Sequence, residues 1–363
     1  MVALAAPRRE KRLHGDWHRF GEVSRMKAAA FSRQNEMAVI DAPEPTAEAG
    51  QVVLQVHDCG ICGSDLHACQ YGMGMPAGSI MGHEFCGEIC EIGPGVSGFK
   101  IGERVAGLPF VFCGECERCK SGMEIHCHNL KGLGLGQLPG AYAEFVACPA
   151  ASLFKLPDNI GSRDGALVEP LSVGLHAVKR SRLQAGMTVL VMGAGPIGLA
   201  TLTWAKGKGA TVVVSELAEG RGELARKLGA ELVVNPRAQN PADKVREMTG
   251  HDPDLVFECI GIKGTLGQAI GMVAPRGQVV VVGVCMETDE IQPLQCILRE
   301  VDVNFVLGYD PADFDETIAA LAAGKINPQP MVTDIIGLEQ VPEMFQTLRH
   351  PGDHAKVLVE FQH

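Results

Sequence analysis

Hydrophobic positions follow two different rhythms along the 363-residue chain. From Met26 to about Ala150, short runs with strand character are broken by glycine and proline. Examples are QVVLQVHD (51–58), FCGEICEIG (85–93) and ERVAG (103–107). This density of turn signals predicts an irregular β domain.

Beyond Leu171 the pattern changes to valine-rich runs that alternate with helical stretches. The runs are TVLVMG (188–193), TVVVSE (211–216), ELVVN (231–235), PDLVFECIG (253–261), QVVVVGV (278–284) and VDVNFVLG (301–308). Strands this apolar are typical of a parallel sheet covered by helices on both faces. From Pro311 a further helix leads to segments such as KVLVE (356–360), which resemble the first region. The pattern predicts an α/β fold in which a doubly wound parallel sheet is inserted into a β-rich domain.

The composition is that of a chain able to bury a large core, with 46% hydrophobic and 21% charged residues, as is usual for a soluble globular protein. The net charge of −11 argues against nucleic acid or a membrane surface as a partner, because both attract basic surfaces. No apolar run reaches the roughly 18 to 20 residues that a membrane span needs.

The thirteen cysteines bear on the expected compartment. In the first segment an apolar stretch precedes the basic residues, which is the reverse of a secretory signal. We therefore expect a cytoplasmic protein with reduced thiols, in which clustered cysteines indicate metal binding or catalysis rather than disulfides. Residues 1–25 are polar and aperiodic, and we expect them to form an N-terminal extension outside the fold.

A glycine-rich turn directly after the first valine-rich run predicts a dinucleotide site. Gly193 allows a tight turn, Gly195 lets the backbone approach a pyrophosphate, and Gly198 lets helix and strand pack closely. Pro196 and Ile197 complete the motif GAGPIG, and the helix that begins there offers free N–H groups to the phosphates. The motif is weak by itself, but its place between a strand and a helix makes it informative.

Glu216 ends the second valine-rich run, at the spacing expected of an acid that binds the adenosine ribose. A carboxylate there accepts hydrogen bonds from a free 2′-hydroxyl and repels a 2′-phosphate, so NAD is favoured over NADP. Arg221, five residues later, could instead bind a phosphate, stack on the adenine, or be a solvated helix residue.

The segment FCGECERCKSGMEIHC carries four cysteines at spacings x2, x2 and x7, namely Cys113, Cys116, Cys119 and Cys127. Four thiolates in one short loop suit a tetrahedral structural zinc, which needs no open coordination position. An iron–sulfur cluster is the chemical competitor because part of the spacing is similar to that of ferredoxins. No proline follows Cys127 and the chain has one such lobe, so zinc is preferred. His126 and His128 are interpreted as neighbours of the site.

A second set of ligand-type residues is dispersed over DCGICGSDLH (58–67), GHE (82–84) and VEP (168–170). A catalytic zinc takes about three protein ligands and an exchangeable water. One thiolate, one imidazole and one carboxylate can supply those ligands. Cys59 and Cys62 share a Cys-x-x-Cys spacing, so by their residue type alone they could be a redox pair, two zinc ligands, or a ligand beside a bystander.

Taken in order, these motifs make the chain resemble the zinc-dependent medium-chain alcohol dehydrogenases, in the branch of the sorbitol, butanediol and threonine dehydrogenases. The resemblance begins at about Met26 and rests on CGSDLH, GHE, the four-cysteine lobe, EPLSVGLHAV, GAGPIG and KVLVE. Each motif is modest alone, and the ordered set is specific. The implied cofactors are NAD and two zinc ions per chain, one structural and one catalytic.

The resemblance also implies a division into domains. A GroES-like catalytic domain would comprise residues 26–171 and 309–363, with the structural zinc lobe at 113–127. A Rossmann NAD-binding domain would comprise residues 172–308.

The ligands of the dispersed zinc site follow from the family's motifs. The ligand cysteine of the family directly precedes Gly-Ser-Asp, which is Cys62 here, so Cys59 falls outside the motif. His83 matches the histidine ligand. Glu84 matches a carboxylate that binds zinc directly in some members and lies beside it in others. Glu169 matches the position of a second cysteine in relatives with a two-cysteine site, which implies ligation directly or through water.

The remaining assignments concern proton transfer and the cofactor. Ser64 is expected to take the proton of the alcohol and to pass it through the cofactor ribose to His67 and water. Asp65 is expected to orient a zinc ligand. Lys356 matches a cationic position that contacts the cofactor pyrophosphate in relatives, or it is a surface lysine. His176 is interpreted as a helix-packing residue.

The implied function is that of an NAD-dependent zinc alcohol dehydrogenase, which moves hydride between a secondary alcohol, or its ketone, and nicotinamide. A polyol, 2,3-butanediol or L-threonine dehydrogenase is the alternative within the family. The rival from another class is a non-catalytic NAD-binding protein of the same fold, which would lack some of the ligand and relay residues that this chain retains. A homo-dimer or homo-tetramer is implied by the family alone.

Substrate preference is predicted from residues near these ligands. Polyol-oxidising relatives carry a tyrosine where this chain has Ala68, and an arginine where it has Gly308 before Tyr309. An apolar wall is expected from Met73, Met75, Phe110 and Phe112. Because an unpaired polar group in a buried site costs about 1 to 3 kcal/mol, such a wall favours an apolar secondary alcohol over sorbitol, xylitol or threonine. Small vicinal diols are an open middle case.

Overall fold

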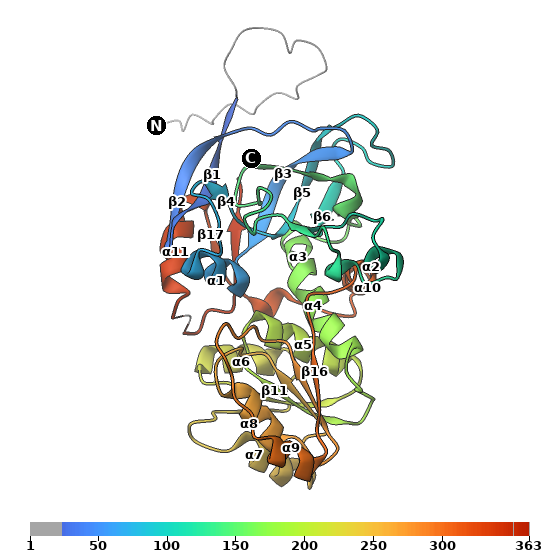
Figure 1. The fold of residues 1–363 in the computed structure, drawn as a ribbon, viewed down its shortest axis with the longest axis vertical. Coiled ribbons are helices and arrows are strands. Elements are labelled where there is room, and N and C mark those ends of the chain that lie inside the picture. Colours follow the sequence, from blue (N-terminus) through green and yellow to red (C-terminus); the bar gives the residue numbers. More distant parts are fainter. Residues whose placement is uncertain (1–23, 351, 363) are drawn as a thin grey trace, which may run out of the picture.

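The fold consists of a β-rich part and an α/β part, and the chain enters the α/β part through the helix α4 (Val168–Lys179) and leaves it after residue 305. Figure 1 shows the computed structural model, which describes residues 24–350 and 352–362, with the β-rich part above and the α/β part below. The extension predicted over residues 1–25 lies outside the described residues up to position 23. Within the described ranges, every helix is too short or too polar to cross a membrane.

Six parallel strands form the sheet of the α/β part, in the order β13-β12-β11-β14-β15-β16. The strands are β11 (Thr188–Met192), β12 (Thr211–Ser215), β13 (Leu232–Val234), β14 (Leu255–Glu258), β15 (Gln278–Val281) and β16 (Asp302–Phe305). All six belong to the valine-rich runs of the sequence. The chain starts at the centre of the sheet and winds outward in both directions, which is the topology of a Rossmann fold. The predicted fold class is confirmed.

Both faces of this sheet are buried. Val189 and Val191 of β11 belong to one apolar core, and the alternate residues Leu190 and Met192 belong to the other. This two-sided burial explains why the strands are almost continuously apolar. The covering helices are α5 (Pro196–Gly207), α6 (Glu219–Lys227), α7 (Pro241–Thr249), α8 (Thr265–Met272) and α9 (Pro293–Arg299).

The β-rich part is organised around β3 (Gln51–Gly60), which lies in a seven-stranded sheet. On one side β3 pairs with β5 (Glu84–Ile92), and on the other with β9 (Phe145–Pro149) at its start and with β18 (Lys356–Glu360) at its end. Because β18 returns to β3 from beyond the parallel sheet, the α/β part is an insertion in the β-rich part. Three further strands complete the sheet, namely β6 (Arg104–Gly107), β10 (Leu153–Lys155) and β17 (Val332–Ile336).

Smaller elements surround this sheet. The strands are β1 (Arg25–Arg33), β2 (Glu36–Pro43), β4 (Ser79–Ile80), β7 (Phe110–Val111) and β8 (Lys131–Gly132). The helices are α1 (Gly63–Tyr71), α2 (Glu117–Lys120), α3 (Ser162–Ala166), α10 (Pro311–Ala322) and α11 (Val341–Thr347). The 3₁₀ turns are η1 (Glu124–His126), η2 (Ala150–Ser152), η3 (Gln329–Met331) and η4 (Leu338–Gln340).

The first connection between the two parts is the helix α4, so a boundary between residues 171 and 172 falls inside a helix. His176 on α4 is buried, and its Nδ1 lies 2.8 Å from Asp313 Oδ2 on α10. Lys179 donates to the other oxygen of Asp313 at 2.7 Å. His176 therefore packs at a helix–helix contact, and the carboxylate beside it is already paired with a lysine.

Candidate functional site

Three predicted ligands meet where β3 ends and β5 begins. The ligand atoms of Cys62, His83 and Glu84 all lie within 4.8 Å of one another. Cys62 precedes α1 as its N-cap, while Glu84 starts β5 and pairs in register with Gly60 of β3. A side chain at Gly60 could not be accommodated, because a Cβ there would lie 2.0 Å from Glu84 Oε2. The glycine in DCGICGSDLH thus leaves room for the carboxylate beside the cysteine.

Asp65 holds two of the ligands in place. Its Oδ2 accepts the Cys62 backbone N–H at 3.0 Å, and its Oδ1 lies 3.0 Å from His83 Nδ1. Since Nδ1 carries the proton that faces this carboxylate, Nε2 is left to bind a metal. Burial disfavours the charged imidazole, but Asp65 and Cys62 outweigh it and raise the pKa of His83 well above its ordinary value.

Tyr142 is a residue of this site that the sequence analysis missed. It is fully buried, and its hydroxyl donates to Asp65 Oδ2 at 2.6 Å. Its ring also fills the space behind the turn before His83, where a Cβ on Gly82 would lie 2.6 Å from Tyr142 Cδ1. The motif GAYAEF offered no ligand-type spacing that could have singled it out.

Glu84 is paired with Lys356 of β18. The ammonium of Lys356 donates to Glu84 Oε1 at 2.7 Å, to Glu84 Oε2 at 2.5 Å and to the carbonyl oxygen of Ile61 at 3.0 Å. Lys356 is fully buried, which corrects the interpretation of a surface lysine. All three ammonium protons have partners in the described structure, so this arrangement gives no support to a contact with the cofactor pyrophosphate, which stays a prediction.

Glu169 lies in the first turn of α4 and is buried next to this group, but it is outside the set of three close ligand atoms. Burial raises the pKa of Glu169 to about 7, against the opposing effect of His83. Tyr309 is the neighbour on its other side, and the buried Tyr309 hydroxyl has no hydrogen-bond partner of good geometry among the described residues. Of the two candidate carboxylates, Glu84 is the nearer to Cys62 and His83.

The donor set fits a zinc ion. A thiol, an imidazole nitrogen with its other nitrogen hydrogen-bonded, and a carboxylate are the ligand types of catalytic zinc sites. Cys59 is fully buried, and its thiol makes one weak contact with the carbonyl oxygen of Gly60 at 3.8 Å. Its place in the structure is that of a core residue, and its role as a bystander stays a prediction.

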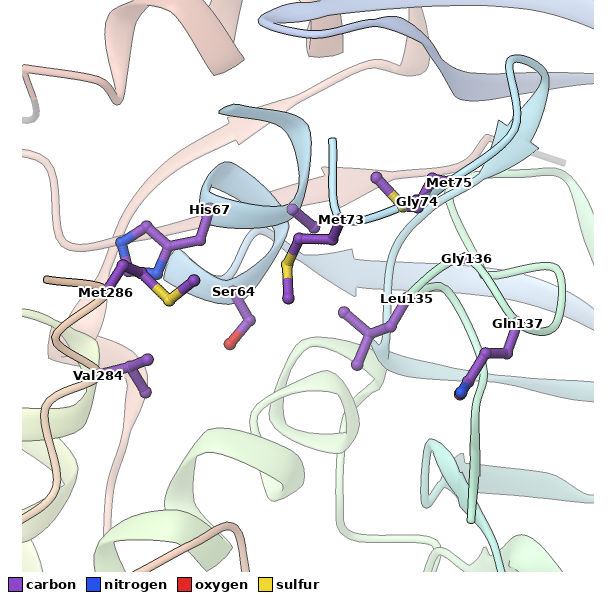
Figure 2. Close-up of a pocket in the computed structure, with 11 residues that line it drawn as sticks. Ser64, His67, Met73, Gly74, Met75, Leu135, Gly136, Gln137, Val284 and Met286 are labelled. Carbon is purple, nitrogen blue, oxygen red and sulfur yellow. The ribbon is translucent and has the colours of Figure 1, made fainter. Parts of the chain in front are cut away.

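A cavity of about 390 Å³ lies beside α1 (Figure 2). Ser64 and His67, both on α1, contribute its polar wall on one side. Burial lowers the pKa of His67 from its ordinary value, so the neutral imidazole is favoured at neutral pH. The two residues predicted to relay a proton are thus brought into one cavity, within the helical turn that follows Cys62.

The predicted apolar wall is right in part. Met73 and Met75 line the cavity, whereas Phe110 and Phe112 pack with Tyr309 in a separate core cluster. The ring of Phe110 lies 6.1 Å from that of Tyr309, between centroids, and neither phenylalanine is among the residues that line the cavity. In their place the wall includes three residues that sequence reasoning missed, Leu135, Val284 and Met286. The last two come from the loop after β15 in the α/β part, as Figure 2 shows.

The four cysteines of the lobe come together as predicted by their spacing. Four of the sulfur–sulfur distances are 3.5 Å for Cys116–Cys119 and Cys113–Cys127, 3.9 Å for Cys116–Cys127 and 4.0 Å for Cys113–Cys119. Four sulfurs at about 2.3 Å from a tetrahedral zinc are roughly 3.8 Å apart, so the lobe fits that ion. Backbone N–H groups lower the pKa of Cys116 to about 6, which favours the thiolate. All thirteen cysteines are free thiols.

The glycine-rich turn lies where a pyrophosphate would be expected. Gly193 has φ of 90°, and a Cβ on Gly198 would lie 1.9 Å from the Gly193 carbonyl oxygen. Gly195 is the N-cap of α5, and Pro196 is its first residue, followed by Ile197. Strand, turn and helix therefore follow in the order that the motif requires.

Glu216 lies across from this turn, just after β12. Its Oε2 accepts the Ala194 N–H at 2.7 Å, while its Oε1 accepts the N–H groups of the next two residues. Arg221 also donates to Oε1, at 2.7 Å. The structure thus places Arg221 as a partner of Glu216 rather than as a solvated helix residue, and the charge of the carboxylate is partly neutralised. Binding of a phosphate and stacking on the adenine stay predictions.

Comparison with known proteins shows the same two parts. Residues 48–158 match the alcohol dehydrogenase GroES-like domain, and residues 196–323 match the zinc-binding dehydrogenase domain. The chain is 35% identical over 338 residues to a 2-dehydro-3-deoxy-L-galactonate 5-dehydrogenase of Pseudoalteromonas atlantica, covering 92% of this chain and 98% of the relative. It is 34% identical over 342 residues to a sorbitol dehydrogenase of Bacillus subtilis, covering 92% and 97%.

Solved structures of dehydrogenases are also similar to this chain. The structure of 2R,3R-butanediol dehydrogenase from Bacillus subtilis is 34% identical, covers 93% of this chain and all of its own, and superposes with a TM-score of 0.84. The structure of a zinc-binding dehydrogenase from Sinorhizobium meliloti, bound to NADP, is 31% identical with a TM-score of 0.85, and covers 93% of this chain and 100% of its own. An alcohol dehydrogenase from Escherichia coli complexed with NADH is 29% identical with a TM-score of 0.84, again at 93% and 100% coverage.

Proposed function

The chain belongs to the zinc-binding alcohol dehydrogenases, and on that premise we propose that it oxidises secondary alcohols with NAD and reduces the corresponding ketones with NADH. The observation that carries the proposal is the group of Cys62, His83 and Glu84 beside a cavity lined by Ser64 and His67. A non-catalytic protein of the same fold would not need these three ligand-type side chains next to proton-transfer groups.

The residues of the site divide the work. Cys62, His83 and a carboxylate, Glu84 or Glu169, would hold the catalytic zinc, which when bound supplies a Lewis acid for the substrate oxygen. Asp65 keeps His83 in the tautomer that a metal requires. Ser64 Oγ takes the hydroxyl proton, and His67, kept neutral by its lowered pKa, accepts it at the solvent side.

NAD is the cofactor that we propose. The carboxylate of Glu216 is held near the glycine-rich turn, where it would accept hydrogen bonds from the ribose hydroxyls. Arg221 reduces the charge that would repel a 2′-phosphate, so the preference for NAD rests on hydrogen bonding as well as on repulsion.

An apolar secondary alcohol is the proposed substrate class. Apart from Ser64, His67 and Gln137, the side chains that line the cavity are apolar or absent, as in Met73, Leu135 and Met286. Because burying unpaired hydroxyl groups costs about 1 to 3 kcal/mol each, a hexitol would bind this wall poorly. A polyol dehydrogenase, as among the relatives, is the second candidate.

The test is a substrate panel followed by NADH absorbance. Medium-chain, cyclic and aryl secondary alcohols should show higher kcat/KM than sorbitol, xylitol or threonine, with NAD preferred over NADP. A clear preference for a hexitol or for threonine would contradict the apolar substrate and leave the enzyme class in place. Absence of turnover with every alcohol, in zinc-replete protein, would contradict the enzyme itself.

A homo-oligomer is the proposed assembly. The edge strand β16 and the helix α9 next to it expose large apolar side chains at Leu294, Ile297, Leu298 and Phe305, each at least 66% exposed. An unpaired strand edge with such a surface favours pairing with a second copy. Light scattering should therefore give at least a dimer, and Phe305→Lys with Leu298→Lys should shift it toward monomer. A monomeric parent protein would contradict the proposal.

We place the protein in the cytoplasm. The proposal is supported by thirteen free thiols, eight of which belong neither to the cysteine lobe nor to the predicted Cys62 ligand, because an oxidising compartment would compete for them. Fractionation of the native host with an antibody to the chain would test the location.

A further inference from the structure

Gln137 is the one hydrogen-bonding side chain of the cavity wall that does not come from α1. Among the described residues that line the cavity, only Ser64, His67 and Gln137 have polar side chains. Figure 2 shows Gln137 on the opposite side of the cavity from His67, with Leu135 in the space between them. A substrate oxygen bound near Ser64 would thus leave the other end of the molecule close to Gln137.

The amide of Gln137 has a defined orientation. Gly132 donates its backbone N–H to Gln137 Oε1 at 2.6 Å. Only the oxygen of an amide can accept that hydrogen bond, so the contact determines which end of the side chain is the NH₂ group. No described residue accepts a hydrogen bond from Gln137 Nε2, and both of its protons are available to a ligand.

The loop that carries Gln137 is held next to the metal ligands. Leu138 donates to the Gly132 carbonyl oxygen at 3.1 Å, and Gly134 donates to the Leu138 carbonyl oxygen at 2.9 Å. Gly134 also packs on the backbone of Gly82, whose oxygen would lie 2.2 Å from a Cβ at Gly134. Since Gly82 directly precedes His83, the position of the free NH₂ group is tied to that of a predicted ligand.

We propose that Gln137 is a specificity-determining donor, which binds a second acceptor oxygen on an otherwise apolar secondary alcohol. The inference rests on the proposed function, because it takes the carbinol end of the substrate to lie near Ser64. Gln137 is exposed, so water can bond to its NH₂ group when the substrate has no acceptor there, and the preference for the oxygen-bearing substrate is that of one net hydrogen bond. The substrate class is thereby narrowed to secondary alcohols with one ether, carbonyl or hydroxyl oxygen further along an apolar chain.

The test uses pairs of alcohols in which an ether oxygen replaces one CH₂. The pairs are 1-methoxy-2-propanol with 2-pentanol, 4-methoxy-2-butanol with 2-hexanol, and 5-methoxy-2-pentanol with 2-heptanol. An ether oxygen can only accept a hydrogen bond, so a higher kcat/KM for the ether than for its alkyl partner indicates a donor in the cavity. Two variants separate the roles of the amide, because Gln137→Glu keeps the acceptor for Gly132 and removes the donor, whereas Gln137→Leu removes both.

We expect one ether to exceed its alkyl partner in kcat/KM, at the chain length that brings its oxygen to Gln137. Both variants should lower kcat/KM for that ether by about 3- to 10-fold, mainly through KM, and should leave the alkyl partner within about twofold. Loss with both partners in Gln137→Leu and with neither in Gln137→Glu would show that Gln137 only holds the loop, which overturns the inference. No preferred ether at any length would also overturn it, with the proposed function intact. Failure to oxidise any of these alcohols would overturn both.

Discussion

Lys356 and Glu84 form an ion pair, with Nζ 2.7 Å from Oε1, and neither side chain is exposed to solvent. The pair joins β18, near the C-terminus, to the first residue of β5, directly after the predicted ligand His83. It neutralises a buried carboxylate that, without a bound metal, would otherwise be an uncompensated charge. Removing one member of such a buried pair is costly, because the other is left without a partner.

The first prediction is that Lys356→Met lowers the free energy of unfolding by about 3 to 5 kcal/mol. The double variant Lys356→Met with Glu84→Gln should recover much of that loss, since no buried charge remains. Urea unfolding followed by circular dichroism measures both. If Lys356→Met were as stable as the parent but had a raised KM for NAD, contact with the cofactor would be its role instead.

The second prediction concerns the two metals. Purified protein should contain close to two zinc ions per chain, and Cys62→Ala should lose one of them and nearly all activity while it stays folded. Cys116→Ala should damage folding, because a structural zinc contributes directly to stability. The matched control is Cys59→Ala, three residues from Cys62, which should keep both ions. Full zinc content and normal turnover in Cys62→Ala would contradict the ligand assignment.

The third prediction concerns the pair of Glu216 and Arg221. Glu216→Ala should weaken NAD binding and narrow the advantage over NADP, because the ribose loses its acceptor and Arg221 becomes free to bind a 2′-phosphate. Adding Arg221→Ala to that variant should reverse the gain with NADP but leave the weak binding of NAD. Steady-state kcat/KM with each cofactor is the measurement. Equal values for the two cofactors in the parent protein would refute the preference.

The fourth prediction is a pH dependence at Asp58, a buried carboxyl whose Oδ1 has no partner among the described residues. Burial raises its pKa above the ordinary value of 3.8, although Ser162 opposes the shift. An acid with a raised pKa binds its proton more tightly in the folded state, so it destabilises the protein at higher pH. This penalty disappears as the pH falls through the folded pKa toward the unfolded value.

Asp58→Asn should therefore raise Tm at pH 7, and the gain should shrink as the pH is lowered toward about 4. Scanning calorimetry at several pH values measures the effect, with Asp158→Asn on the surface as the control. A lower Tm at pH 7, or a gain that persists at pH 4, would show that the carboxylate is stabilised where it lies.

Most of the fold was predictable from local patterns. The strands of the parallel sheet are apolar over their full length because both faces are buried. The glycine-rich turn must follow a strand and start a helix in order to bind a pyrophosphate. The four cysteines could be grouped for a similar reason, since they lie within one short segment, from Cys113 to Cys127, and a loop of that length brings its own residues together. Cys62, His83 and Glu84 were found through their motifs, although their distance in the sequence hides their contact.

What the sequence by itself determined is the set of local elements and the chemistry that each short motif can carry. Only the tertiary structure decided which of these meet, because the pairing of distant segments depends on the packing of the whole chain. Lys356 lies 272 positions from its partner Glu84 in the sequence. Its local sequence is compatible with a surface residue, and only the pairing of β18 with β3 places it beside Glu84. The cavity wall likewise takes Val284 and Met286 from one part and Gln137 from the other. No periodicity records such a contact, since it arises from the way two domains are packed together.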